Sequence, residues 1–311
     1  MKLIISSAPH IREHYSINKI MYNVVIALFP ATFAAVYFFG IPALTVIIAS
    51  VVSAVLIEGL INLIKKEPLT IKDGSAALTG LLLALTLPPI MPIWMIFVGN
   101  LVAIGIAKQA FGGMSQNIFN PALTGRIFLM VAYPVTLTTW FKPGFLFGFT
   151  NITSATPLAD TTMGFHVWDL FVGNIAGSIG ETSAIAILIG AAWLLFTRTI
   201  EWRMPAGFFG AIMGMCFLFN SSVLINVLAG GALLGGFFML TDYVTSPVTK
   251  SGRFIYGVLT GILVMCIRLW NNMPEGVAFS IVFMNALVPL IDKLTVGLHL
   301  KLFELKFKQS E

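Results

Sequence analysis

The chain has few of the residues on which soluble enzymes depend. Charged residues fill 10% of its 311 positions, against about 25% in soluble domains. Its two cysteines, Cys216 and Cys266, lie in separate apolar stretches without metal-ligand spacing, so we expect them to pack as small hydrophobic residues. The four histidines do not cluster, and no Walker motif, dinucleotide-binding glycine fingerprint, Ser/His/Asp set or HExxH motif occurs. Nucleotide chemistry of the soluble type is therefore excluded.

Long apolar runs stand where the charges are missing. Hydrophobic residues make up 58% of the chain, and many runs approach the roughly 20 residues that a membrane-spanning helix needs. The runs predict an all-α polytopic membrane protein in contact with lipid. The ten predicted spans are 20–40, 41–64, 74–90, 91–111, 125–141, 175–197, 203–220, 223–241, 253–271 and 276–292.

The basic residues predict how the chain is oriented. If the N-terminus is cytoplasmic, ten spans return the C-terminus to the cytoplasm, and of the 18 lysines and arginines only Lys142 and Arg268 fall outside. The positive-inside rule requires such an excess. The same count places Lys108 and Arg126 at the cytoplasmic surface and Thr156 outside. It explains the net charge of +5 without a nucleic-acid partner.

Five spans followed by five of opposite direction suggest an inverted repeat. The segments 74–80 and 230–236 are similar in their glycines and small residues at an offset of 156, and Pro134 answers Pro289. Chance similarity between apolar helices is the alternative, because small residues occur throughout membrane bundles. The third and eighth spans are short and end in proline-containing polar segments. Paired interrupted helices of this kind predict a substrate or ion route between the repeats.

Four acidic residues lie in or near the predicted spans. Glu58 is in the second span, Asp73 begins the third, and Asp242 and Asp292 end the eighth and tenth. Carboxylates are expensive in hydrocarbon, so they usually face a cavity or a partner, and they suit a small cation. Hydration or surface pairing at the inner interface is the alternative. The surface partners would be Lys72, Arg253 and Lys293, and Lys65 or Lys66 for Glu58.

Two polar segments interrupt the apolar pattern. The first holds Asn117 and Asn120, whose spacing would put both amides on one face of a helix, although they could equally cap the fifth span. The second, 142–168, is rich in hydroxyl groups and contains Thr156 before a proline. Proline disfavours helix in the residue before it, so a turn or an extended loop is the ordinary interpretation.

Five motifs in order carry a resemblance. They are Asp73-Gly-Ser-Ala with the prolines that follow, Asn117-Ile-Phe-Asn-Pro-Ala-Leu, Ser154-Ala-Thr-Pro-Leu, Thr241-Asp242 with Ser246-Pro247, and Pro289-Leu-Ile-Asp292. Together they resemble the NqrB/RnfD family over essentially the whole chain, and the short N-terminus is closer to the Rnf branch. The resemblance implies two inverted five-helix repeats, 20–141 and 175–292, with a fold similar to urea and ammonium transporters. An extracytoplasmic flavin-attachment loop, 142–174, would join them, and a cytoplasmic tail, 293–311, would follow.

The family also implies a function and a set of sites. The function is that of a translocase subunit, not catalytic alone, of a ferredoxin:NAD oxidoreductase that exports sodium ions or protons across a bacterial or archaeal cytoplasmic membrane. The threonine matching Thr156, after Ser154 and Ala155, would carry FMN through a phosphoester bond. Positions that line a riboflavin site in the Nqr homologue match Asn117, Asn120 and Leu123. The implied ion pathway contains Glu58, Asp242 and Asp292, with an aromatic constriction at Phe238, although Leu234 stands where a second aromatic is expected.

The implied partners are other membrane and peripheral subunits, among them a second flavin-bearing subunit. A stand-alone channel or transporter for a small polar solute is the alternative from another class, because the same inverted-repeat fold serves it without redox chemistry. A purely structural anchor explains neither the repeat nor the interrupted helices.

Overall fold

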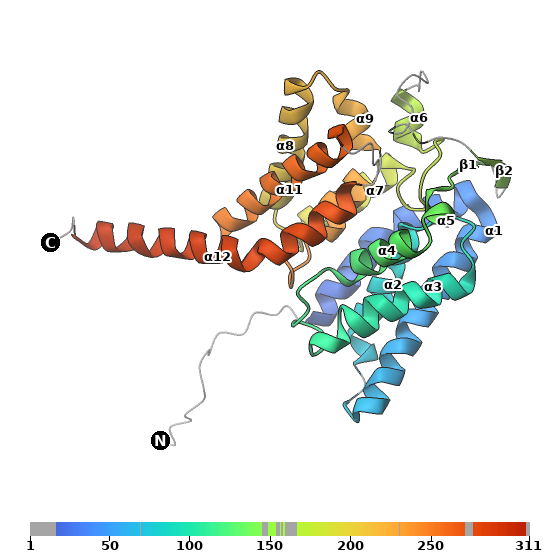
Figure 1. The fold of residues 1–311 in the computed structure, drawn as a ribbon, viewed down its shortest axis with the longest axis horizontal. Helices are drawn as coiled ribbons and strands as arrows, with labels where there is room; N and C mark the ends of the chain where they lie inside the picture. Colours follow the sequence, from blue (N-terminus) through green and yellow to red (C-terminus); the bar gives the residue numbers. More distant parts are fainter. Residues whose placement is uncertain are drawn as a thin grey trace.

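The computed structural model describes residues 17–68, 70–144, 149–153, 156, 158, 167–229, 231–270 and 276–308. The chain folds into helices of very different lengths, with one small hairpin (Figure 1). Four described helical segments are long and apolar enough to cross a membrane: Ile17–Lys65, Ile93–Phe111, Lys250–Trp270 and Gly276–Gly297. Four shorter apolar helices pack among them, at Ser75–Leu85, Pro121–Ala132, Ala184–Phe196 and Arg203–Leu218.

The first helix, α1 (Ile17–Lys65), consists of two arms. They meet at Gly40, whose φ of 66° and ψ of −146° interrupt the helical backbone. This break falls at the predicted boundary between the first two spans. Glycine adopts a positive φ without the steric cost that a side chain imposes, so the chain changes direction there with no intervening loop.

The rest of the first half contains short and irregular helices. After a 3-10 turn, η1 (Ile71–Asp73), come α2 (Ser75–Leu85) and α3 (Ile93–Asn100), and α3 continues as a π-helix, η2 (Leu101–Ile106). A second 3-10 turn, η3 (Gln109–Phe111), precedes α4 (Pro121–Ala132) and α5 (Pro134–Thr138).

The second half repeats this pattern in part. Its elements are α6 (Val167–Val172), α7 (Ala184–Phe196), α8 (Arg203–Leu218), α9 (Val223–Leu228), α10 (Ala232–Leu234), a π-helix η4 (Gly235–Met239), α11 (Lys250–Trp270) and α12 (Gly276–Lys308). Helix therefore continues into the predicted tail, as far as residue 308.

The predicted eighth span, 223–241, is not one helix. It is interrupted between Leu228 and Ala232, where Gly231 has a φ of 71°. Arg268 donates to the carbonyls of Asn226 (2.6 Å) and Ala229 (3.4 Å), so backbone groups exposed by the break are paired. Gly74, at the start of α2, has nearly the same conformation, with a φ of 77°. The sequence register of 156 is thus off by one at this point.

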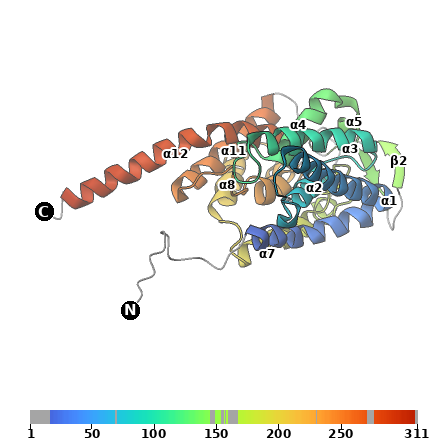
Figure 2. The ribbon, with the colours of Figure 1, turned by 90° about the horizontal axis from the view of Figure 1, so that it is seen from below.

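A two-stranded hairpin lies at one end of the molecule. Strand β1 (Phe141–Pro143) pairs antiparallel with β2 (Phe149–Thr153), and the N–H of Gly144 donates to the carbonyl of Phe38 beside the turn of α1 (3.1 Å). The end of α12 extends away from the bundle at the opposite end in two perpendicular views (Figures 1 and 2).

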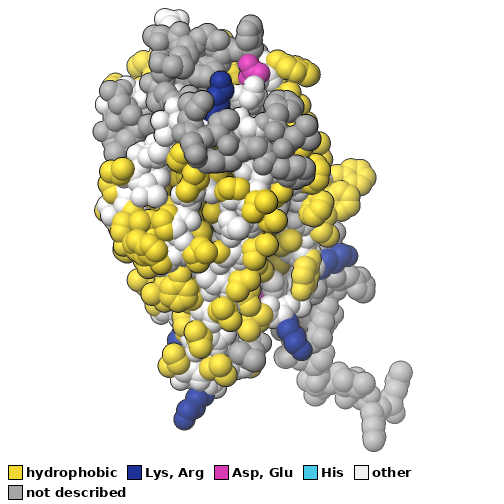
Figure 3. Space-filling model, turned by 90° about the vertical axis from the view of Figure 1, so that its right-hand side faces the viewer, with side chains coloured by type: hydrophobic (Ala, Val, Ile, Leu, Met, Phe, Trp, Pro, Cys, Tyr) yellow, Lys and Arg dark blue, Asp and Glu magenta, His cyan; other side chains and the backbone are white. Residues whose placement is uncertain are grey.

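The outer surface is strongly apolar. Hydrophobic side chains cover most of the described face in Figure 3, and residues such as Phe29 (69% exposed), Ile64 (80%) and Phe217 (75%) face outward. Soluble proteins rarely expose so much contiguous apolar surface. With the four long apolar helices, this surface identifies an integral membrane protein. Cys216 is buried and Cys266 half-buried, and both are free thiols, as the packing role requires.

Candidate functional site

Two cavities with charged and polar groups in their linings lie where the interrupted helices meet. The larger has a volume of about 750 Å³, including the space at its mouth, and is lined by residues of α1, α2, the segment before α4, and η4 with the residues after it. Its polar lining comprises Ser75, Thr79, Lys108, Asn117, Asn120, Thr241, Asp242 and Tyr243. The smaller, of about 270 Å³, is lined by Thr86, Leu123, Arg126, Glu181, Gly231, Gly235, Met239, Val277 and Ala278.

A buried ion pair stands beside the larger cavity. Nζ of Lys108 lies 2.7 Å from Oε2 of Glu58, and the two side chains are 3% and 0% exposed. Lys108 also donates to Oγ of Ser75 (2.6 Å), in the first turn of α2. The hydroxyl of Thr70 donates to Oε1 of Glu58 (2.6 Å). Each carboxylate oxygen therefore has a donor, which a buried charge requires.

This pairing shows which partner Glu58 takes. Lys108, 50 residues away along the chain, is buried against the carboxylate of Glu58. Glu58 does not take Lys65 as its partner, because Nζ of Lys65 donates to the carbonyl of Gln109 (2.5 Å).

The other predicted pathway acids lie in different surroundings. Asp242 lines the larger cavity and accepts hydrogen bonds from the N–H of Val244 (3.3 Å) and the hydroxyl of Thr245 (3.2 Å). Asp292 accepts from the N–H of Val248 (3.0 Å) and lines neither of the two cavities among the described residues. The structure thus brings Asp242 to the cavity and leaves Asp292 apart from it.

The two asparagines line the larger cavity without sharing a helical face. Residues 112–120 are irregular, and Asn120 caps α4 by accepting from the N–H of Leu123 (3.3 Å). Its Nδ2 donates to the carbonyl of Met239 (3.2 Å), while Nδ2 of Asn117 makes a long bond to Phe119 (3.4 Å). The capping interpretation is right for Asn120. Leu123 faces the smaller cavity, so the structure divides the three predicted riboflavin positions between the two cavities.

The larger cavity has the size and chemistry of a small-molecule site. Such sites are commonly 300–1,000 Å³, mainly apolar, with a few polar groups that fix orientation. Asn117 offers an amide for a heteroaromatic ring edge, and Phe238 and Tyr243 offer aromatic surfaces. The amide of Asn120 is already engaged at both ends, so it holds η4 against α4.

A second ion pair lies in the lining of the smaller cavity and joins α4 to the segment before α7. Nη1 of Arg126, in α4, lies 3.5 Å from Oε1 of Glu181, and their side chains are 5% and 12% exposed. The same guanidinium donates to the carbonyl of Thr86 at the end of α2. The positive-inside count does not predict this burial, in which the carbonyl at the C-terminal end of α2 attracts the cation.

Glu181 lies beside the start of α10, a position that the sequence does not predict. A Cβ placed on Gly231 would overlap Oε1 of Glu181, so this carboxylate packs directly against the start of α10. In the sequence, an acidic residue directly before an apolar helix is the pattern from which Glu181 could have been identified. Its position by Gly231 depends on the segment preceding α7, whose N–H groups at Ile179 and Gly180 donate to the carbonyls of Leu87 (3.0 Å) and Leu85 (2.8 Å).

Buried apolar side chains of η4 and α4 line the two cavities. Phe238 lines the larger cavity and its neighbour Met239 the smaller, and they are 5% and 2% exposed. Leu123 (2% exposed) lies on the α4 side. Leu234, at the position of the expected second aromatic, is fully buried. The π-helix η4 therefore presents one apolar residue to each cavity.

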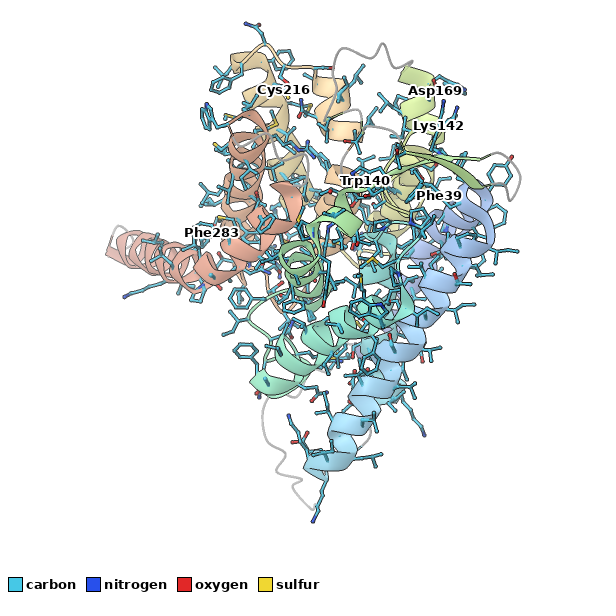
Figure 4. The ribbon with its side chains drawn as sticks, turned by 45° about the vertical axis from the view of Figure 1, so that its right-hand side comes forward. Phe39, Trp140, Lys142, Asp169, Cys216 and Phe283 are labelled. Carbon is cyan, nitrogen blue, oxygen red and sulfur yellow. The ribbon has the colours of Figure 1, made fainter. Side chains whose placement is uncertain are left out.

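Thr156 follows the hairpin, near which Figure 4 shows Lys142 on β1 and Asp169 on α6. Thr156 is buried, with 9% of its surface exposed. Within the described part of the chain, Oγ1 of Thr156 has no hydrogen-bond partner, which costs free energy for a buried hydroxyl. An ester oxygen has no proton to donate, so esterification would leave no donor unpaired and the residue fits a phosphoester link. Ser154 and Ala155 lie outside the described residues.

Comparison with known proteins agrees with these features. A model of the "NQR2, RnfD, RnfE family" matches residues 4–301. A protein of Clostridium ljungdahlii, named as the D subunit of a proton-translocating ferredoxin:NAD(+) oxidoreductase complex, is 42% identical, with 94% of each chain covered. A Na(+)-translocating counterpart from Acetobacterium woodii is 41% identical, covering 95% of this chain and 94% of its own.

A third relative, from Stutzerimonas stutzeri, is named as the D subunit of an ion-translocating oxidoreductase complex. It is 40% identical, with 89% and 90% of the two chains covered. The family match and these relatives extend over nearly the whole sequence. The chain therefore belongs to the NQR2, RnfD, RnfE family.

Proposed function

We propose that this chain is the D subunit of an ion-translocating ferredoxin:NAD oxidoreductase complex, in which it relays electrons and carries ions across the membrane. The names of its relatives support the complex. The observation that carries the transport role is the pair of interrupted helices starting at Gly74 and Gly231, together with two cavities that contain charged side chains and are lined by the neighbouring residues Phe238 and Met239. The chain is a translocase subunit and needs the other subunits for catalysis.

The proposed architecture is ten membrane crossings in two inverted five-helix repeats, 20–141 and 175–292, with a fold like that of urea and ammonium transporters. The matching positive φ at Gly74 and Gly231, each at the start of a short helix, supports the repeat. In this proposal both termini are cytoplasmic and Thr156 is outside. The position of the hairpin, at the end opposite that of α12, supports this orientation (Figure 2).

The proposed ion route begins in the larger cavity. Asp242 supplies a carboxylate there, while Lys108 neutralises Glu58. A cation that uses Glu58 has to displace the ammonium of Lys108, so binding at Glu58 is coupled to movement of that side chain. Phe238 and Met239 block the way to the smaller cavity, where Glu181 offers the next carboxylate and Arg126 neutralises it.

Thr156 is the proposed attachment point of FMN, and the larger cavity, through Asn117, the proposed place for riboflavin. Flavins supply the one- and two-electron chemistry that links this subunit to its redox partners, among them a second flavin-bearing subunit. The chain itself would fix the position of the attached group through β2, which ends three residues before Thr156. Because Thr156 is 9% exposed, its hydroxyl has to become accessible for the transfer reaction.

Flavin fluorescence on a denaturing gel tests the redox assignment. The chain is produced in cells that contain a flavin transferase, denatured, and separated from noncovalent ligands. We expect a fluorescent band for the wild type, none for Thr156→Val, and an unchanged band for Thr153→Val, which removes an exposed hydroxyl three residues earlier. A colourless wild-type band would reject covalent FMN and favour a solute channel. Equal fluorescence in both variants would reject Thr156.

The ion route is tested with the assembled complex in vesicles. Electron transfer and uptake of sodium ions or protons are measured separately for Asp242→Asn and, as the comparison acid outside the cavities, Asp292→Asn. We expect Asp242→Asn to lower ion uptake per electron much more than Asp292→Asn does. Equal uptake in the two variants would remove Asp242 from the route, and a larger loss in Asp292→Asn would move the route toward α12.

A further inference from the structure

The first turns of α8 and α11 form two clefts that share Trp202. One is lined by Trp202, Arg203, Lys250, Ser251 and Phe254. The lining of the other includes Arg198, Glu201, Trp202, Tyr243 and Arg253. Four cationic side chains and one carboxylate thus line the pair. The ion pathway proposed above uses none of these residues.

The charges in these clefts do not cancel. Glu201 is held by Arg253 (2.5 Å) and by Arg203, so its charge is shared between two guanidinium groups. Arg198 and Lys250 add two further positive charges to the lining. The clefts therefore suit an anion of more than one charge or an anion at a crowded negative surface.

Aromatic groups accompany the cations. Trp202 is 61% exposed and Phe254 47% exposed, and the guanidinium of Arg203 lies 5.6 Å from the centre of the Trp202 ring. Tryptophan at the end of a spanning helix is typical of the boundary between headgroups and acyl chains. The stacked ring also keeps the guanidinium in place beside the cleft.

An exposed apolar face continues from the clefts along α11. Phe254, Ile255, Leu259 and Ile262 are 47%, 40%, 41% and 36% exposed, and they recur at helical spacing on the side opposite the buried residues Tyr256, Thr260 and Val264. On α8, Met213 and Phe217 are likewise exposed. Glycines at 207, 257 and 261 bring α8 and α11 close together, since added Cβ atoms would overlap backbone carbonyls of the other helix.

We propose that these clefts bind the headgroup of an anionic phospholipid whose acyl chains lie along the exposed face of α11. The charge of the lining selects a negative headgroup, and the apolar face beneath Phe254 requires a ligand with hydrocarbon attached. A free phosphate would use only the cations and leave Phe254 and Ile255 uncovered. Basic pockets between transmembrane helices are the usual binding places of such headgroups.

The test compares lipid retention by the purified chain and its variants. The chain is stripped of lipid in detergent and mixed with phosphatidylglycerol or with phosphatidylcholine of the same acyl chains, and native mass spectrometry counts the lipids retained per chain. The pocket variant is Arg203→Gln with Lys250→Gln, and the matched control is Lys72→Gln with Lys293→Gln, which removes two exposed lysines outside the clefts. The wild type and the control are expected to bind phosphatidylglycerol about 30-fold more tightly than the pocket variant, because the pocket variant lacks two cations near the membrane surface.

Three results would overturn the proposal. They are equal retention of phosphatidylglycerol by the pocket variant, equal affinity of the wild type for phosphatidylcholine, and displacement of the lipid by inorganic phosphate at the same concentration. Trp202→Phe tests where the lipid binds. Phosphatidylglycerol with brominated acyl chains should quench the tryptophan fluorescence of the wild type more than that of Trp202→Phe. Unchanged quenching would place the lipid elsewhere. None of these measurements uses electron transfer, so they stand apart from the proposed redox role.

Discussion

Replacing Lys108 with methionine should destabilise this protein far more than replacing a surface lysine does. The change keeps an apolar chain of similar length but leaves the carboxylate of Glu58, which is 0% exposed, without its cation. Ser75 loses a donor as well. Breaking a buried ion pair by removing one partner costs about 3–5 kcal/mol, and we expect Lys108→Met to fall in that range. Lys65→Met, whose side chain bonds to one carbonyl, should cost about 1 kcal/mol.

The second half of the prediction concerns the double variant. Glu58→Gln alone leaves a buried ammonium without its carboxylate, so it should cost about as much as Lys108→Met. Glu58→Gln with Lys108→Met removes both charges, and replacing a buried pair by neutral groups is often nearly neutral in stability. The double variant should therefore recover most of the loss. Unfolding in detergent, followed by circular dichroism during denaturant titration, supplies the four free energies of a double-mutant cycle.

Simple additivity in that cycle would refute the reasoning. If the double variant loses the sum of the two single costs, Glu58 and Lys108 act independently and the 2.7 Å contact does not describe their interaction. Single costs close to that of Lys65→Met would show instead that water reaches the pair. In either case Lys108 would no longer be the group that a transported cation has to displace.

Two further perturbations test the packing and the surface charges. Gly190→Ala should destabilise the contact of α7 with α1 by about 1–3 kcal/mol, because the added Cβ would overlap the carbonyl of Ala27. The control Gly210→Ala should be neutral or slightly stabilising, because its Cβ would meet no atom within 4 Å. Thermal unfolding of both variants measures the difference. Burial raises the pKa of Glu201, but hydrogen bonds and charges of Arg253 and Arg203 outweigh it, so the pKa lies below 4.5. The contribution of Glu201 to stability should be complete above pH 4.5 and should disappear as the pH falls through its lowered pKa in the folded protein. In acid unfolding curves, the stability advantage of the wild type over Glu201→Gln should therefore vanish below that pKa. An advantage that grows in acid would contradict the lowered pKa.

The membrane class and the interrupted helices could be predicted from the sequence because both depend on local composition. Apolar runs of spanning length and short runs ended by glycine or proline are visible in the residues themselves. The similarity of segments 74–80 and 230–236 points to Gly74 and Gly231, which each start a helix with positive φ, but the break inside the predicted eighth span at Gly231 was not predicted.

The electrostatics of the site could not be predicted in the same way. The positive-inside count assigns each cation to one side of the membrane, so it could not show that Lys108 and Arg126 are buried in ion pairs. Their partners, Glu58 and Glu181, are 50 and 55 residues away along the chain, and such distances carry no sequence signal. The burial of Thr156 could not be predicted for a similar reason, because contacts with elements distant in the sequence decide whether a loop residue is exposed.

The bonds from Ile179 and Gly180 to Leu87 and Leu85 have a mechanical consequence. An unpaired carbonyl at membrane depth costs several kcal/mol, so separating these two backbone segments would expose two such groups at once. The segment before α7 and the end of α2 should therefore move as one rigid piece. That piece also carries Glu181 and lies 23 residues beyond Thr156 in the chain. A displacement of the segment before α7 can thus reach the end of α2 directly through backbone hydrogen bonds, without any change in side-chain contacts.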